Sequence, residues 1–213
     1  RKLATLLRGG FLRGVYHSDN DQRVLLKQWV GLYHGRVKES VRQINMIRGL
    51  CLRHGVRPAR GAVRNVKCRR PWLKSLAAEV SGELEMLFLG FDVTVKQVEL
   101  SRQKMGGLAK PHKIIQWWQE LPGMGPIRAA TLFAYLDTPW RFACNPHKLW
   151  KYCGIGLEQS SSGKDRNGRM KVGQLQLAWQ VNKRLKAVVM GAANSVAARI
   201  GPIPGSSCHH WMI

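Results

Sequence analysis

The segment from Ser160 to Gly173 holds the residues whose types could act on a phosphodiester. Three consecutive serines end at Ser162, and four cations follow without an apolar period: Lys164, Arg166, Arg169 and Lys171. Such cations can neutralise a scissile phosphate and stabilise the charge that develops when a hydroxyl attacks it. A serine in a surface loop is usually only solvated, and the segment holds no histidine to act as a base. His147 lies fifteen residues before Ser162, and we interpret it as structural.

Metal chemistry is not indicated by the acidic residues. Metal-dependent phosphodiester cleavage needs several carboxylates that converge on Mg²⁺. The five aspartates are scattered over expected caps, turns and loops. The five cysteines form no Cys-x-x-Cys pair, so neither a zinc finger nor a disulfide framework is predicted, and a reducing cytoplasm fits best. We therefore predict no metal or cofactor site in this chain.

A glycine-rich turn lies between two short apolar segments, 112–120 and 127–136. Its sequence is Leu121-Pro-Gly-Met-Gly-Pro126, and Pro126 stands at a favoured first helical position. Gly123 and Gly125 allow a tight bend, and the following helix would present N–H donors and its positive dipole end to a phosphate. The pattern indicates a helix-hairpin-helix. The alternative is a turn that only packs two helices together.

The overall charge points to a polyanionic partner. The 213 residues hold 35 Lys and Arg against 12 Asp and Glu, a net charge of +23, and both halves of the chain are basic. With 45% hydrophobic residues the chain is too apolar to be disordered, and it has no apolar run long enough to span a membrane. Residues 57–70 hold six basic and no acidic residues, and we expect Arg57, Arg60 and Arg64 to contact nucleic acid. The alternative is a solvated connector.

Apolar spacing predicts a mainly α fold that positions these segments. One long helix is expected from about 19 to 54 and a second over 72–100, paired as an antiparallel helical hairpin. The glycine and β-branched residues at 89–95 make the end of the second helix uncertain, and residues 104–111 indicate a turn-rich domain boundary. A final amphipathic helix is expected from Gly173 to about Ala198.

The segments at 121–132, 141–142, 149–154 and 159–173 resemble, in order and spacing, the C-terminal domain of the insertion sequence one-ten/eleven-eleven family of transposases. The resemblance implies a DNA recombinase in which an Asp-Glu-Asp-Asp RuvC-like domain binds Mg²⁺ and a serine forms a covalent link to DNA. Ser162, which precedes a glycine, corresponds to that nucleophile. Some members are guided by an RNA that the element encodes. Leu157, Gln174 and Ala178 depart from the family pattern, which usually has Pro, Asn and Arg there.

The resemblance also divides the chain. Residues 1–18 would be the remnant of the RuvC-like domain, 19–103 a coiled-coil-like arm, 104–120 a linker with a lead-in helix, 121–200 the C-terminal transposase domain and 201–213 a disordered tail. The acidic tetrad would precede residue 1, so we expect a truncated transposase that binds DNA, does not recombine it alone, and forms a homo-oligomer when full length. Two alternatives stay open, a non-catalytic nucleic-acid-binding module and a decayed transposase remnant.

Overall fold

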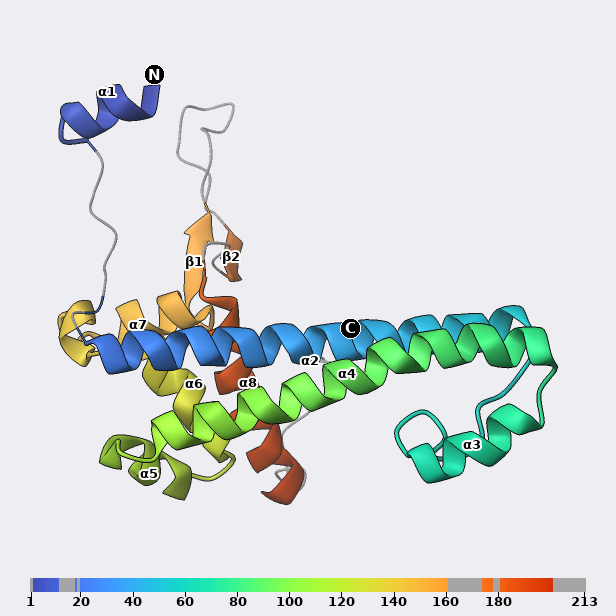
Figure 1. The fold of residues 1–213 in the computed structure, drawn as a ribbon. Coiled ribbons are helices and arrows are strands. Elements are labelled where there is room, and N and C mark those ends of the chain that lie inside the picture. The colour runs from blue at the N-terminus through green and yellow to red at the C-terminus, as the bar shows by residue number, and fades with distance from the viewer. Residues whose placement is uncertain (1, 12–17, 19, 161–173, 178–180, 201–213) are drawn as a thin grey trace.

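A computed structural model describes residues 2–11, 18, 20–160, 174–177 and 181–200, and helices dominate these residues (Figure 1). The mainly α fold class is thereby confirmed. The helices are α1 (Lys2–Arg8), α2 (Asp21–Arg53), α3 (Val66–Lys74), α4 (Ala78–Ala109), α5 (Lys113–Glu120), α6 (Pro126–Leu136), α7 (Pro146–Cys153) and α8 (Lys183–Ile200). A 3₁₀-helix, η1, covers Pro139–Phe142, and two short strands are β1 (Leu157–Ser160) and β2 (Gln174–Leu177).

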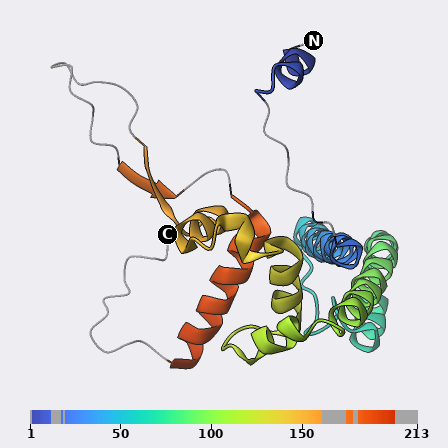
Figure 2. The ribbon, with the colours of Figure 1, turned by 90° about the vertical axis from the view of Figure 1, so that its left-hand side faces the viewer.

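Helices α2 and α4 form an arm in which they lie side by side and run in opposite directions (Figures 1 and 2). The Asn20 side chain starts α2 by accepting a hydrogen bond from the Arg23 N–H at 3.1 Å. The distal half of the arm has its own core, in which α2 contributes Ile44, Ile47 and Cys51 and α4 contributes Leu84 and Phe88. The long helices are thus held by an apolar stripe on each, as the spacing predicted.

The second long helix begins later than the predicted residue 72. Trp72 and Leu73 belong to the separate helix α3, which ends where the Ser75 hydroxyl donates to the Trp72 carbonyl at 2.7 Å. Both residues nevertheless pack into the same distal core as the residues of α4. Periodicity alone could not reveal the break, because residues on both sides of it face one apolar cluster.

The turn predicted over 104–111 was wrong as far as residue 109, because α4 continues through Gly106 and Gly107 to Ala109. Met105 and Ala109 are buried in the proximal core, so tertiary packing outweighs the low helix propensity of the two glycines. The stretch 89–95 is likewise helical throughout, and the Thr94 hydroxyl donates back to the Gly90 carbonyl at 3.0 Å.

The proximal core joins the base of the arm to the C-terminal helices. It combines Leu26 and Val30 of α2 with residues of α4, α5 and α6, including Ile115 and Phe133. Helix α8 packs on the far side of α6 (Figure 2). The division into domains at 104 and 121 stays a prediction, but the two parts of the chain share this core.

The final helix begins at Lys183 rather than at the predicted Gly173. Residues 174–177 instead form β2, which pairs antiparallel with β1 so that Leu157 lies opposite Leu177. Asn182 immediately precedes α8 and starts it, because its side chain accepts from the Arg184 and Leu185 N–H groups at 3.1 and 3.2 Å. The cap signal was in the sequence, but Leu177 and Val181 also fitted a helical period. The predicted disordered tail, 201–213, lies outside the described residues.

Candidate nucleic-acid interface

The turn between α5 and α6 is pressed against α8 at Gly123. This residue has φ +77°, and a Cβ there would lie 2.5 Å from the Ala192 carbonyl oxygen. A side chain is therefore excluded both by the left-handed backbone and by the neighbouring helix. Packing alone accounts for a glycine at 123, and contact of this residue with nucleic acid stays a prediction.

Gly125 has the opposite surroundings. It is exposed, it is the N-cap of α6 with φ −76°, and a Cβ there would meet nothing within 4 Å. No side chain caps this end of α6. Because Pro126 has no N–H, Ile127 and Arg128 carry the first amides of α6, at the positive end of the helix dipole and next to the exposed Gly125.

Arg128 fastens the turn to α8. Its Nη1 donates to the Gly123 carbonyl and, at 2.8 Å, to the Ser195 hydroxyl, which in turn donates to the Gly191 carbonyl at 2.8 Å. Gly191 leaves room for the guanidinium, since a Cβ there would lie 3.0 Å from Nη2. One side chain thus holds the glycine turn, α6 and α8 in a single arrangement.

A groove of about 880 Å³ opens beside the exposed end of α6. Three elements besides α6 supply its walls: α2, the C-terminal half of α4 and α8. Five cationic side chains line it, and none of the described lining residues is acidic: Lys38, Arg102, Arg128, Lys183 and Arg184. Lys38, Arg102 and Lys183 are exposed along the rim, and Arg102 forms a solvent-exposed ion pair with Glu99 at 3.7 Å, which a phosphate can replace.

The groove has a neutral polar floor built by His34 and Thr131. The Thr131 hydroxyl donates to the Ile127 carbonyl at 2.7 Å, so the His34 Nε2, 3.1 Å from Thr131 Oγ1, acts as the donor to this hydroxyl. Burial, aided by the nearby Arg184, lowers the pKa of His34. The ring is therefore neutral near pH 7 and adds no charge to the groove.

Strand β1 begins and strand β2 ends next to a polar junction, whose side chains come from η1, α7 and the residue before α8. The Tyr152 hydroxyl accepts from the Arg141 guanidinium at 3.2 Å and from the Asn182 amide at 3.1 Å. The Asn182 N–H also donates to the Tyr152 carbonyl at 2.9 Å. The start of α8 and the end of α7 are thereby held together where β1 and β2 leave the helical body.

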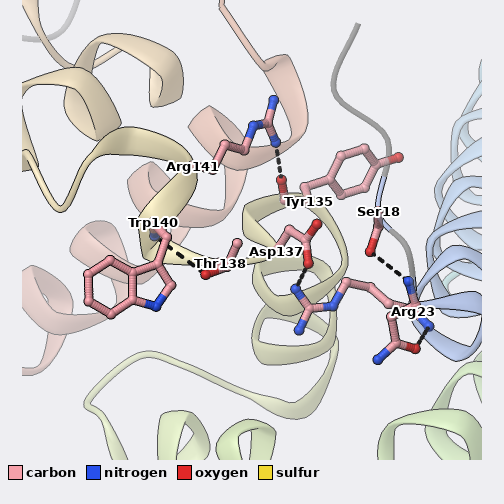
Figure 3. Close-up of polar contacts among 8 residues, drawn as sticks. Ser18, Arg23, Tyr135, Asp137, Thr138, Trp140 and Arg141 are labelled. Atoms are coloured by element: carbon pink, nitrogen blue, oxygen red, sulfur yellow. Dashed lines mark hydrogen bonds and ion pairs between the residues drawn. The ribbon is translucent and has the colours of Figure 1, made fainter.

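A second polar cluster ties this junction to the first turns of α2 (Figure 3). Arg23 of α2 forms an ion pair with Asp137, which follows α6 at φ +65°, and its guanidinium lies 4.1 Å from the centre of the Phe133 ring. Arg141 donates to the Tyr135 carbonyl at 3.5 Å (Figure 3). A left-handed backbone at a non-glycine residue is strained, and the ion pair with Arg23 holds it in place.

The basic connector 57–70 is ordered rather than a loose linker. Arg57, Arg60 and Arg64 are exposed, whereas Arg69 is buried and donates to both oxygens of Asp92 at 2.7 and 3.0 Å. This connector lies at the far end of the arm from α5, α6 and α8 (Figure 1). The described residues that were predicted to bind nucleic acid thus lie in two separate regions, Gly123 and Gly125 in the glycine turn and Arg57, Arg60 and Arg64 at the far end of the arm.

Comparison with known proteins gives a family match for the part of the chain that includes the glycine turn. Residues 116–205 match the family model described as "Transposase IS116/IS110/IS902 family". The matched segment is similar to the C-terminal region of transposases of this family. The resemblance drawn from the sequence is thereby confirmed. No curated protein matches the chain.

The matched region contains the glycine turn, Arg128, Tyr152 and, in its sequence, Ser162. Ser162, Lys164, Arg166, Arg169 and Lys171 lie outside the described residues, which resume on either side at Ser160, the end of β1, and at Gln174, the start of β2. Their assignment as nucleophile and phosphate ligands stays a prediction. The match begins at residue 116, after the arm helices α2 and α4. Arg57, Arg60 and Arg64 therefore lie outside the matched region.

Sequence reasoning missed most of the residues that line the groove. Lys38 and Arg102 lie far from residue 123 along the chain, and only the packing of α2 and α4 on α6 brings them to it. Lys183 and Arg184 were hidden inside a helix that was predicted to start ten residues earlier. The Asn182 cap was the one local signal that placed these two residues at a helix start.

Two features are not found among the described residues of the chain, a metal-binding cluster and a membrane-spanning helix. There, no three His, Cys, Asp or Glu side chains are placed to hold a metal ion, so the described residues do not fit Mg²⁺ and no step is assigned to it. None of the described helices combines the length and apolar character that crossing a bilayer requires.

Proposed function

We propose that this chain binds the sugar-phosphate backbone of DNA in the groove beside α6 and joins it through Ser162. The family match indicates a role in transposition. The observation that carries the DNA-binding proposal is the groove itself, which sets five cations and no acidic side chain around an exposed helix N-terminus. Phosphate oxygens are the ligands that such donors and charges favour.

The solvent exposure of each cationic side chain indicates its role in the groove. Lys38, Arg102 and Lys183 extend from three different helices and reach phosphates along a strand, while the α6 amides bind one phosphate at close range. Arg128 mainly holds the turn in shape, since its Nη1 is committed to Gly123 and Ser195. Contacts of this kind position DNA without reading its sequence.

In the proposed chemistry the Ser162 Oγ attacks a phosphorus atom of the bound strand. A bond from Oγ to phosphorus forms, the bond from phosphorus to the leaving sugar oxygen breaks, and that oxygen takes up a proton. The number of phosphate ester bonds is unchanged, so a second sugar hydroxyl can reverse the step and join new ends. Lys164, Arg166, Arg169 and Lys171 would neutralise the charge that develops on the phosphate.

The position of the polar junction supports the proposed role of Ser162. Arg141, Tyr152 and Asn182 fasten α7 to α8 at the point where β1 begins and β2 ends. A serine on the connection between these strands is attached to a rigid support. Less conformational entropy is therefore lost when its hydroxyl is placed next to the phosphate.

A second candidate function is a non-catalytic helix-hairpin-helix module. The packing of Gly123 against Ala192 favours it, because that glycine has a structural reason to exist without any chemistry. DNA is the principal partner in both cases. A guide RNA, assembly of several copies and a cytoplasmic location belong to the transposase proposal alone.

The discriminating experiment compares Ser162→Ala with the matched control Ser161→Ala, each in a chain that includes the acidic domain expected upstream. Labelled DNA is incubated with each protein and run on a denaturing gel to detect a covalent adduct. We expect Ser162→Ala to abolish the adduct and leave DNA affinity unchanged, and Ser161→Ala to keep both. An adduct that survives Ser162→Ala would remove Ser162 as the nucleophile.

A further inference from the structure

A hollow of about 500 Å³ lies at the tip of the arm, between α2 and the connector 57–65. Its walls combine two kinds of side chain. Ile44, Pro58 and Val63 give it an apolar surface, and the guanidinium groups of Arg48, Arg60 and Arg64 stand around it. These three arginines are exposed, and no acidic residue lines the hollow among the residues described.

The hollow has a rigid wall because a buried arginine holds the connector from behind. Arg69, only 4% exposed, donates to the Ala62 and Val63 carbonyls at 3.3 and 3.2 Å and stacks on Phe88 at 3.9 Å. Its remaining donors bind both oxygens of Asp92. This network fixes the backbone that carries Arg60 and Arg64 before any ligand arrives.

The turn itself is closed by its own backbone. Gly61 adopts φ +80°, and its carbonyl accepts from the Arg64 and Asn65 N–H groups at 3.1 and 2.8 Å. Ala62 is fully buried beneath it in the distal core. A connector that served only to span α2 and α3 would not need this degree of order.

The positive charge around the hollow is not neutralised by acidic side chains among the described residues. Residues 48–78 contain nine basic residues and no acidic one. Asp92, on the adjoining helix, is already bound to Arg69, and Glu83 lies 3.4 Å from the His54 ring. The guanidinium groups at the rim form no hydrogen bond or ion pair within the part of the chain that the structure describes. Their charge is available to a ligand.

We infer that this hollow binds one unpaired nucleotide of a single-stranded nucleic acid. A patch for phosphate alone needs cations but no apolar recess. A nucleobase has an apolar face that stacks on guanidinium planes, and its flanking phosphates bind the exposed charges. Bases inside a duplex are already stacked and cannot enter such a recess. The site is separate from the groove beside α6 and does not depend on the function proposed for it.

The test measures binding of the whole chain to three labelled twelve-residue probes by fluorescence anisotropy. Oligo-dT and oligo-U carry bases on deoxyribose and ribose, and an abasic oligomer of equal length carries the same phosphates without bases. Arg64→Lys keeps the charge and removes the planar group, and Ala59→Leu fills the hollow with an aliphatic side chain without changing charge. Arg70→Lys is the matched control, because Arg70 is exposed on α3 and does not line the hollow.

Arg64→Lys and Ala59→Leu should each weaken oligo-dT binding about fivefold or more and leave the abasic probe unchanged, since stacking is lost but phosphate contact is not. Arg70→Lys should change neither. The better of oligo-dT and oligo-U identifies which sugar the site accepts. If the abasic probe binds as tightly as oligo-dT, or if both variants leave oligo-dT binding unchanged, the nucleotide site is overturned. The groove proposal would stand in either case.

Discussion

The groove beside α6 and the hollow at the arm tip are both basic, but they use arginine in opposite ways. In the groove, Arg128 is bound by Gly123 and Ser195, and the exposed charges at its rim are Lys38, Arg102 and Lys183. At the tip, one arginine, Arg69, is buried to build the wall, and the other arginines point outward. Two of the three rim charges of the groove are lysines, which suit phosphates as point charges, whereas all three rim charges at the tip are guanidinium planes, which also suit bases. A high count of basic residues therefore does not reveal which cations bind a ligand and which hold the fold.

The largest expected effect tests the packing of the groove wall. Gly123→Ala forces a side chain into a left-handed backbone against the Ala192 carbonyl and should lower the free energy of unfolding by about 3 kcal/mol. Gly125→Ala, in open space at φ −76°, should cost less than about 1 kcal/mol. Urea denaturation measures both. Equal losses would show that α8 does not press on the turn.

The next effect tests the buried arginine at the tip. Arg69→Met leaves the Ala62 and Val63 carbonyls and Asp92 without their donor and should cost about 2 kcal/mol, moderated because Asp92 is partly exposed. The matched change Arg64→Met, at the exposed rim, should stay within about 0.5 kcal/mol. If the two variants unfold at the same urea concentration, the tip has no buried anchor and the contrast with its outward arginines fails.

A smaller effect tests the fastening of the groove by Arg128. Arg128→Met and Ser195→Ala should each cost about 1 kcal/mol, because each removes a partly buried hydrogen bond. Their double variant should cost less than the sum, since the two side chains share one contact. Thermal unfolding of the four proteins gives this coupling. Strict additivity would show that Arg128 does not hold α8.

How far the sequence could predict these regions depends on whether the determining contact is local. The long helices followed from apolar spacing, and the glycine turn followed from six consecutive residues. The break at Ser75 and the continuation through Gly106 did not, because burial in a shared core decides both. The same holds for the site residues. Lys38 and Arg102 join the groove, and Arg69 meets Asp92, only through the packing of α2, α3, α4 and α6.

The smallest effect is a pH dependence confined to the arm base and groove. Burial lowers the pKa of His34 and of His112, with nearby Arg184 and Arg23 adding to the shift. The unfolded chain therefore binds these protons first, so the unfolding free energy should fall as the pH drops below about 6.5. His34→Gln should make this pH dependence shallower in denaturation curves between pH 5 and 7.5. A curve as steep as that of the parent chain would exclude His34 from this effect.

The most direct test of the groove as the DNA site is the salt dependence of duplex DNA affinity. The triple change Lys38→Gln, Arg102→Gln and Lys183→Gln is compared with Lys67→Gln, Arg70→Gln and Lys74→Gln, which removes equal charge from α3. Each lost phosphate contact lowers the slope of log affinity against log salt by about 0.9. We predict that the groove triple lowers the slope by about 2 to 3 and the α3 triple leaves it nearly unchanged. Equal changes in the two triples would contradict the groove and leave only diffuse attraction between a basic protein and DNA.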